Sequence, residues 1–196
     1  MENNIYNAPE AELVDQSNST DEVIEFYVIP QTKLWIFSIF SLGIFLLPWN
    51  YMQWRRVKQT QNSSIWPVPR AIFSIFFVNS LFNMFDTSRK QSDREYSWSP
   101  GTNAGMYILF VVLSNVIDFF EAEFSGPSEW IYWLIVLGTL FVPIWAVSNA
   151  QRVANLAAGD PTGARNSQWT IANYVWCLVL ALFWALAIYG LFYAEY

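Results

Sequence analysis

Long apolar runs alternate with short polar segments along this chain. Four runs have the length of a membrane crossing and cover residues 34–54, 102–120, 130–149 and 172–193. About 20 apolar residues in a helix span a hydrocarbon core of roughly 30 Å. A fifth run, 71–85, is shorter and has polar residues on one helical face, which is typical of a re-entrant or interfacial helix. The pattern predicts an all-α, polytopic helical membrane protein.

The first run is the strongest of the four. Residues 34–54 are 21 residues without a charge, and Arg55, Arg56 and Lys58 follow directly. An apolar run that ends in aromatic and basic residues is typical of a membrane helix anchored at the headgroup level. We therefore expect one continuous crossing here.

Two topologies remain open, and they differ in whether residues 71–85 cross the membrane. With four transmembrane helices plus a short helix, nine basic residues lie on one side, and Lys33 lies with the N-terminal tail on the other. The positive-inside rule then places the nine in the cytoplasm and the tail outside. With five transmembrane helices, the tail is cytoplasmic and the basic residues divide six to four. The charge distribution favours four crossings.

The N-terminal segment 1–32 differs in composition from the helical domain 33–196. It has seven acidic residues and no basic residue, and Asn, Ser and Thr make up much of the rest. So polar a segment cannot bury enough apolar surface to order itself. We expect an acidic and largely disordered tail.

Composition narrows the chemistry that this chain can carry. Hydrophobic residues make up 54% of it and charged residues 13%, whereas soluble domains have about 25% charged residues. A net charge of −6 argues against a nucleic-acid partner, because a phosphate backbone requires a basic surface. The chain has no histidine, and Cys177 is its single cysteine. No catalytic residue, metal site or cofactor is therefore predicted.

Asn4, Tyr6, Ala8 and Pro9 resemble an Asn-x-Tyr-x-Ala-Pro opening that many small bacterial membrane proteins share, although those usually have Pro where this chain has Ile5. Further segments resemble a family of uncharacterised bacterial multi-pass membrane proteins. These segments are 26–28, 70–77, 96–101, 158–161 and 166–167. The resemblance implies a multi-pass protein of the bacterial cytoplasmic (inner) membrane, and it transfers no catalytic residues. The N-terminal opening favours the five-crossing topology, because it often precedes a cytoplasmic tail.

Asp118 is the one acidic residue inside an apolar run. With Glu121 and Glu123 it would offer oxygen ligands to a hard cation, and Asn115 adds a polar group one turn earlier in the run. The alternative is that Asp118 reaches the interface at the end of its helix and has no special role.

A second group of polar residues follows the third long run. Asn149, Arg152 and Asn155 recur every three residues and are expected to share one helical face. They form either a polar rim that binds a lipid headgroup or partner, or simply a solvated helix end.

Three functions remain open. The leading hypothesis is a non-enzymatic integral membrane protein that acts by protein or lipid contact, in a scaffold, regulatory or protective role in the cell envelope. The alternatives are a small transporter or channel subunit and an intramembrane lipid-modifying enzyme. Membrane lipids are the expected partners, together with an envelope protein or a second copy of the chain.

Overall fold

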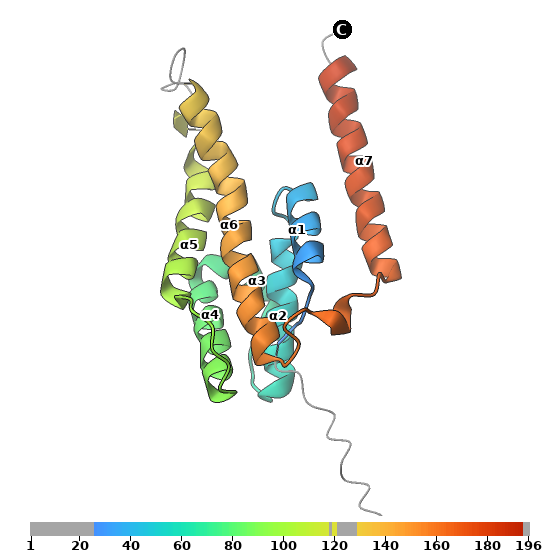
Figure 1. Ribbon diagram of the computed structural model, residues 1–196. Helices are drawn as coiled ribbons and strands as arrows, with labels where there is room; N and C mark the ends of the chain where they lie inside the picture. Colours follow the sequence, from blue (N-terminus) through green and yellow to red (C-terminus); the bar gives the residue numbers. More distant parts are fainter. Residues whose placement is uncertain (1–25, 118, 121–128, 194–196) are drawn as a thin grey trace, which may run out of the picture.

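The computed structural model describes residues 26–117, 119–120 and 129–193. These residues form seven α-helices and contain no β-strand (Figure 1), so the prediction of an all-α chain is confirmed for this part of it. The helices are α1 (Gln31–Phe40), α2 (Leu46–Thr60), α3 (Pro67–Ile72), α4 (Ser74–Gln91), α5 (Pro100–Val116), α6 (Glu129–Ala157) and α7 (Ile171–Tyr193).

The run 34–54 is not one continuous helix, so the expectation of one unbroken helix over these residues is wrong. It is divided between α1 and α2 by a turn over residues 41–45. Leu42 and Gly43 have φ angles of 50° and 84°, and left-handed backbone of this kind ends a right-handed helix. In Figure 1, α1 rises to the turn and α2 descends from it. The two helices therefore form a hairpin whose ends lie at the same end of the molecule.

The hairpin turn satisfies its own backbone groups. The Gly43 N–H donates to the Ser38 carbonyl at 2.7 Å, and the Phe45 N–H donates to Ser41 Oγ at 2.9 Å. The turn lies near the middle of α6, where a Cβ placed on Gly43 would be 3.8 Å from Leu140 Cδ1. A turn in apolar surroundings is stable only when its polar backbone groups are paired, and this one meets that condition.

The short apolar run 71–85 is also divided. Phe73, with φ −96° and ψ 41°, separates α3 from α4. Pro67 and Pro69 both lie in the first turn of α3, where a missing N–H leaves no helical hydrogen bond unmade. The helix predicted over 71–85 thus becomes the end of α3 and the longer α4.

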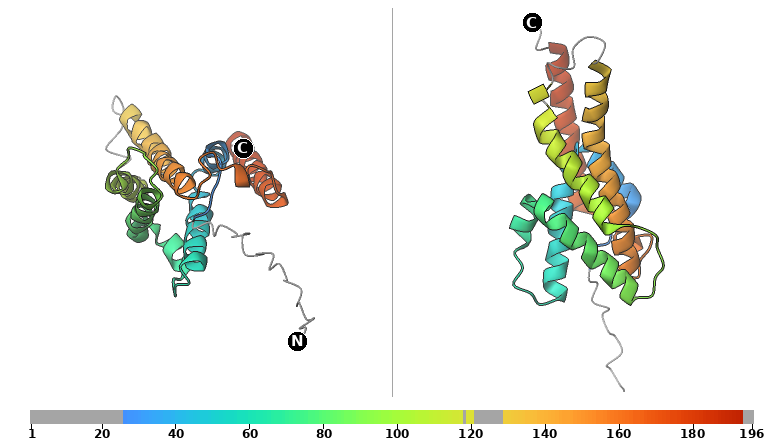
Figure 2. Two further views of the ribbon diagram at one scale, coloured as in Figure 1. Left: turned by 60° about the horizontal axis from the view of Figure 1, so that its bottom comes forward. Right: turned by 90° about the vertical axis from the view of Figure 1, so that its left-hand side faces the viewer.

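α5 and α6 pack along each other (Figure 2). Ser99 caps α5 by accepting a hydrogen bond from the Thr102 N–H at 3.3 Å, and Pro100 begins the helix. α6 contains Pro143 and is long and apolar enough to cross a membrane. Among the described helices, α7 is the other that meets this criterion, over Ile171–Gly190.

α7 stands apart from the remaining helices in Figure 1, and most of its described side chains are exposed. Its attachment to α1 is aromatic and polar. The rings of Phe37 and Trp169 lie 5.6 Å apart, and Trp184 Nε1 donates to the Phe40 carbonyl at 2.8 Å. That carbonyl lies in the last turn of α1, where no helical N–H follows to pair with it.

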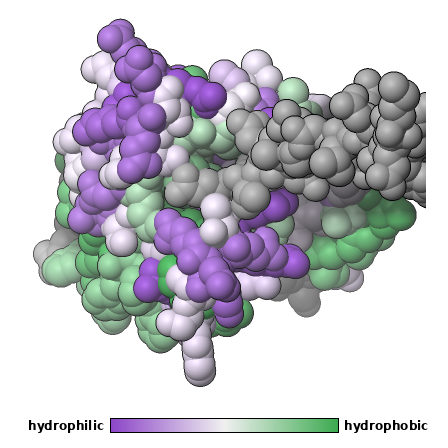
Figure 3. All heavy atoms as spheres, turned by 90° about the horizontal axis from the view of Figure 1, so that it is seen from below, coloured by the Kyte–Doolittle hydropathy of each residue, from purple (hydrophilic) through white to green (hydrophobic). Residues whose placement is uncertain are grey.

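The buried core lies around the lower halves of α2, α4 and α6. Phe85 is central to it and contacts Phe26 and Trp49 edge-to-face, with centroid separations of 4.7 and 6.4 Å. Eight of the ten basic residues lie in the last turns of α2, α4 and α6 or in the loops that follow α4 and α6, whereas Lys33 lies in α1 and Arg70 in α3. Figure 3 shows hydrophilic residues gathered on the lower face of the molecule, which we call the polar end.

Candidate functional site

An extended segment, residues 26–30, enters the polar end and is held there by side-chain amides. Gln53 of α2 accepts a hydrogen bond from the Tyr27 N–H at 3.0 Å and donates to its carbonyl at 2.9 Å. Asn155 of α6 pairs with Ile29 in the same way, at 3.3 and 3.0 Å. The two amides contact alternate residues of the segment, as a neighbouring β-strand would.

Gln151 of α6 joins these pairs into one buried network. Its Oε1 accepts hydrogen bonds from Trp49 Nε1 at 2.6 Å and Gln53 Nε2 at 2.9 Å. Its Nε2 donates to the Tyr27 carbonyl at 3.0 Å and to Asn155 Oδ1 at 2.6 Å. A buried polar network that satisfies its members favours one arrangement over all others. We call Gln53, Gln151 and Asn155 the amide clamp; it holds the start of the hairpin against α2 and α6.

The loop after α6 closes over the same segment. Asp160 accepts hydrogen bonds from the backbone N–H groups of Ala164 and Arg165, both at 2.8 Å. Burial acts to raise the pKa of Asp160, but these hydrogen bonds outweigh it and hold the pKa below its ordinary value. From the rigid loop, Asn166 Nδ2 donates to the Val28 carbonyl at 3.0 Å.

Asp86, near the end of α4, is the centre of a second polar cluster at the polar end. Its Oδ1 accepts hydrogen bonds from Arg89 Nη2 at 2.8 Å and Trp98 Nε1 at 2.9 Å, and Lys90 Nζ lies 2.6 Å from its Oδ2. Burial opposes the charged carboxylate, but Lys90, Arg89 and Trp98 outweigh that effect and lower the pKa of Asp86 to about 2. The cluster ties α4 to the segment leading into α5, so it supports the fold.

A cavity of about 660 Å³ surrounds the tip of the hairpin, and we call it the tip cavity. Its walls come from the turn and the start of α2, from the α3–α4 junction, and from the facing sides of α5 and α6. The lining residues are Leu42, Gly43, Ile44, Leu46, Leu47, Ala71, Ile72, Ser74, Tyr107, Val111, Ser114, Val136, Leu137, Thr139, Leu140 and Pro143. Ligand pockets in proteins commonly measure about 300–1,000 Å³, so the tip cavity has the size of a binding site.

The chemistry of the tip cavity is mainly aliphatic, with one polar pair. Ser74 Oγ and Tyr107 Oη form a hydrogen bond of 2.8 Å that joins the start of α4 to α5. The hydroxyls of Ser114 and Thr139 instead donate to carbonyls of their own helices, at 2.8 and 2.7 Å. The cavity therefore suits a ligand that is mostly hydrocarbon, with a polar group placed against the Ser74–Tyr107 pair.

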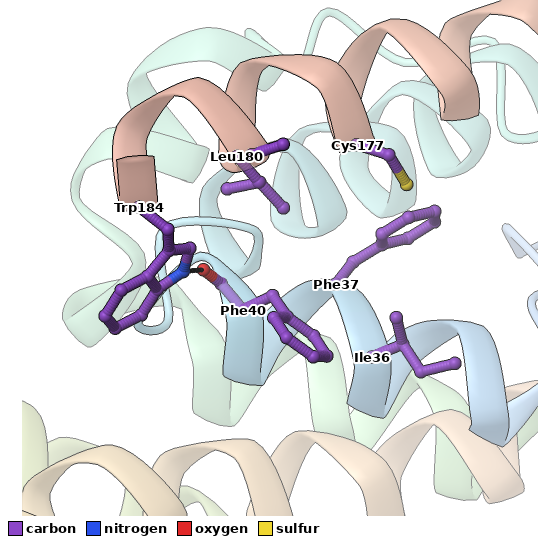
Figure 4. Close-up of a pocket in the computed structure, with 7 residues that line it drawn as sticks. Ile36, Phe37, Phe40, Cys177, Leu180 and Trp184 are labelled. Carbon is purple, nitrogen blue, oxygen red and sulfur yellow. Dashed lines mark hydrogen bonds between the residues drawn. The ribbon is translucent and has the colours of Figure 1, made fainter. Parts of the chain in front are cut away.

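A smaller pocket of about 360 Å³ separates α1 from α7. Figure 4 shows Phe37 and Phe40 from α1 facing Cys177 and Leu180 from α7, with the Trp184 indole bonded to the Phe40 carbonyl at one edge. Apart from that hydrogen bond, the pocket is apolar, so it suits a hydrocarbon chain.

The acidic candidates Asp118, Glu121 and Glu123 lie outside the described residues. Asn115 is exposed on α5, and its amide donates to the Val111 carbonyl at 2.7 Å and approaches Ser114 Oγ at 3.4 Å. These bonds stay within one helix.

The three polar residues near the end of α6 do not form one rim. Asn149 Nδ2 donates to Asn103 Oδ1 on α5 at 3.1 Å, Arg152 is exposed, and Asn155 is fully buried in the amide clamp. The three residues therefore have different surroundings: Asn149 contacts α5, Arg152 is exposed and Asn155 is buried. Gln53 and Gln151 are not among the residues predicted from the sequence to form a site, although each is a polar residue at the edge of an apolar run.

No protein-family model matches this sequence, and neither a curated protein nor a solved structure matches it. The resemblance to bacterial multi-pass membrane proteins therefore remains a prediction.

Proposed function

We propose that this chain is a non-enzymatic, multi-pass protein of the bacterial cytoplasmic membrane that works by holding a lipid or lipid-like amphiphile in the tip cavity. In this proposal α5, α6 and α7 cross the membrane. The α1–α2 hairpin and the α3–α4 pair enter from the polar end and reach only partial depth. The positive-inside rule supports a cytoplasmic polar end, because eight of the ten basic residues lie in the last turns of α2, α4 and α6 or in the loops that follow α4 and α6.

The observation that carries the proposal is the position and lining of the tip cavity. Leu140 lies near the middle of α6, a helix long enough to cross a membrane, so a cavity at this level opens at hydrocarbon depth. Its aliphatic walls match an acyl or isoprenoid chain, and the Ser74–Tyr107 pair offers a hydroxyl as donor or acceptor. An uncharged polar group of the ligand would be held at that point.

Photo-crosslinking tests the proposal. The full chain is reconstituted with a phospholipid that carries a diazirine in its acyl chain, and labelled peptides are mapped by mass spectrometry. Labelling near Leu140, in the cavity, is compared with labelling near Leu186, which is exposed on α7. We expect excess unlabelled amphiphile to suppress the signal at Leu140 more strongly than the signal at Leu186, because a site saturates and a lipid-facing surface does not.

Two neighbouring valines supply a matched pair of variants. Val111 lines the tip cavity, whereas Val112 on the same helix is exposed and does not line it. Val111→Phe fills the cavity and is expected to lower labelling at Leu140 several-fold, while Val112→Phe leaves it unchanged. Equal labelling in both variants would show that Leu140 meets only bulk lipid, and the proposal would then be wrong.

A transporter or channel subunit is the second candidate, and one specific observation favours it. The turn between α1 and α2 and the junction between α3 and α4 line the same cavity, and transporter binding sites are typically formed where helices are interrupted. Flux of a solute into proteoliposomes that Val111→Phe abolishes and Val112→Phe preserves would establish this role. Saturable crosslinking without flux would support lipid binding instead.

A further inference from the structure

The ten basic residues divide into two equal groups. Five have acceptors within the protein: Lys33 (Asn166 and Gln168 carbonyls), Arg89 and Lys90 (Asp86), Arg94 (Leu156 carbonyl) and Arg165 (Ala158 carbonyl). The other five have neither a hydrogen-bond acceptor nor an ion-pair partner among the residues that the structure describes. They are Arg55, Arg56, Lys58, Arg70 and Arg152, and four of these five lie on α2 and α3.

Two of the unpaired arginines share a pocket. Arg55 and Arg56 line a space of about 280 Å³ together with Met52 and Gln59. The spacing of these four residues places them on one face of the last turns of α2. That face is turned away from the buried Gln53 and Trp54, so two guanidinium groups and one carboxamide converge on a small polar pocket at the surface.

The pocket lies where the apolar part of the protein meets its polar end. Gln53 is hydrogen-bonded to Gln151 of α6 at 2.9 Å, so the two residues lie at the same level. Arg55 and Arg56 follow Gln53 within one turn, and on α6 the apolar run 130–149 ends just before Gln151. In the proposed membrane orientation this level is the headgroup region.

An aromatic residue next to the pocket in the sequence supports the same depth. Trp54 directly precedes Arg55, and the Arg70 guanidinium stacks on its ring, 4.4 Å from the centroid. Aromatic side chains next to basic ones are typical of the membrane interface.

We infer that the pocket formed by Arg55, Arg56 and Gln59 binds the phosphate of an anionic phospholipid such as phosphatidylglycerol. The guanidinium group presents paired N–H donors whose geometry matches phosphate oxygens, and the Gln59 amide provides a further donor for the headgroup. Anionic lipid adds a net negative charge that two unpaired arginines can neutralise. This site is separate from the tip cavity. The pocket recognises the headgroup of a lipid, whereas the tip cavity recognises a hydrocarbon chain.

Native mass spectrometry of the full chain tests the inference. The protein in neutral detergent is titrated with phosphatidylglycerol or with phosphatidylcholine carrying the same acyl chains. The double variant Arg55→Gln/Arg56→Gln removes two charges from the pocket. Lys58→Gln/Arg152→Gln is the matched control, since it removes two unpaired charges that do not line the pocket.

A charge near an anionic headgroup changes the binding constant by roughly fivefold. We therefore expect the pocket variant to weaken phosphatidylglycerol binding by about 30-fold, the control to weaken it by less than fivefold, and phosphatidylcholine binding to be unchanged. Equal weakening by both double variants would indicate a diffuse electrostatic field and would overturn the inference. Circular dichroism of each variant verifies that the helices remain intact.

Two competitors distinguish the source of the phosphate. Glycerophosphoglycerol and inorganic phosphate carry the same acceptor chemistry without acyl chains. If the pocket binds a lipid, neither competitor displaces phosphatidylglycerol at equal concentration, because the acyl chains of the lipid hold its headgroup at the interface. Displacement by inorganic phosphate at equal concentration would show that the pocket takes a soluble anion, and the lipid assignment would be wrong.

Discussion

The carboxamide of Gln53 pairs with both backbone groups of Tyr27, accepting from its N–H at 3.0 Å and donating to its carbonyl at 2.9 Å. Tyr27 and Gln53 are 26 positions apart, and the segment between them contains all of α1 and the turn after it. The pairing therefore closes the hairpin at its base and places Tyr27 beside α2, about two turns before that helix ends at Thr60. It is the contact on which the arrangement of the N-terminal half depends.

Gln53→Leu is expected to destabilise the fold by about 2–3 kcal/mol. The substitution leaves the buried Tyr27 N–H without its acceptor and removes a donor to Gln151, and each unpaired buried group costs about 1–3 kcal/mol. Gln59→Leu, on the exposed face of the same helix, is the control and should change stability little. Equilibrium unfolding in mixed detergent measures both, and equal stability of the two variants would mean that the amide clamp contributes nothing.

Gly163→Ala is expected to loosen the contact between the loop after α6 and the extended segment. Gly163 has φ +71°, and a Cβ there would lie 2.5 Å from the Ile29 carbonyl carbon and from the Pro30 nitrogen. Because backbone rather than a flexible side chain is in the way, the free energy of unfolding should fall by at least about 2 kcal/mol.

The control for that substitution is Gly105→Ala in α5, since a Cβ at Gly105 has nothing within 4 Å. Alanine is the better helix former by about 1 kcal/mol, so this variant should be as stable as the parent or more so. Thermal unfolding compares the two. A Gly163→Ala protein with an unchanged midpoint would show that residues 29–30 do not pack on this loop.

The low pKa of Asp86 predicts that the free energy of unfolding falls in acid. Its folded pKa of about 2 lies below the ordinary value of 3.8, so the carboxylate stabilises the fold fully above about pH 4 and loses that effect as the pH falls toward 2. This difference in pKa stabilises the folded state by about 2 kcal/mol at neutral pH. Asp86→Asn should cost a similar amount at pH 7 and remove this part of the acid dependence. An unchanged pH profile of unfolding in the variant would assign the acid sensitivity to other groups.

The helical character of the chain was predictable because it follows from apolar run length and from helix boundaries that sequence encodes. Ser99 caps α5, and Pro100 lies in its first turn. Both residue types are favoured at these positions. The runs 130–149 and 172–193 correspond to α6 and α7. Apolar length alone, however, does not say whether a run is one helix or two.

The hairpin could have been suspected from three residues inside the run 34–54. Gly43 takes the left-handed backbone of the turn, Pro48 lies in the first turn of α2, and Asn50 begins a polar half that a lipid-facing helix would not have. Because the run contains no charged residue, it is nevertheless predicted as one helix. By contrast, Gln53 and Gln151 lie 98 positions apart, and nothing local in either segment indicates that they meet. The tip cavity depends on how five helices and the hairpin turn pack together, and the hydrophobic periodicity of single segments does not predict such packing.

The central claim is that α1 and α2 form a hairpin that enters the membrane and returns to the same side. Cysteine accessibility tests it most directly. In a Cys177→Ser background, single cysteines are introduced at Ser17 in the tail, Gln61 after α2 and Glu129 at the start of α6. An impermeant thiol reagent is applied to intact spheroplasts and, as a control for reactivity, to lysed ones.

The hairpin topology predicts that intact spheroplasts protect positions 17 and 61 together and leave position 129 labelled, with all three labelled after lysis. Labelling at 17 with protection at 61 would mean that residues 34–54 cross the membrane as one helix, and labelling at 61 with protection at 17 would likewise require a crossing between them. Either result would contradict the hairpin in the membrane.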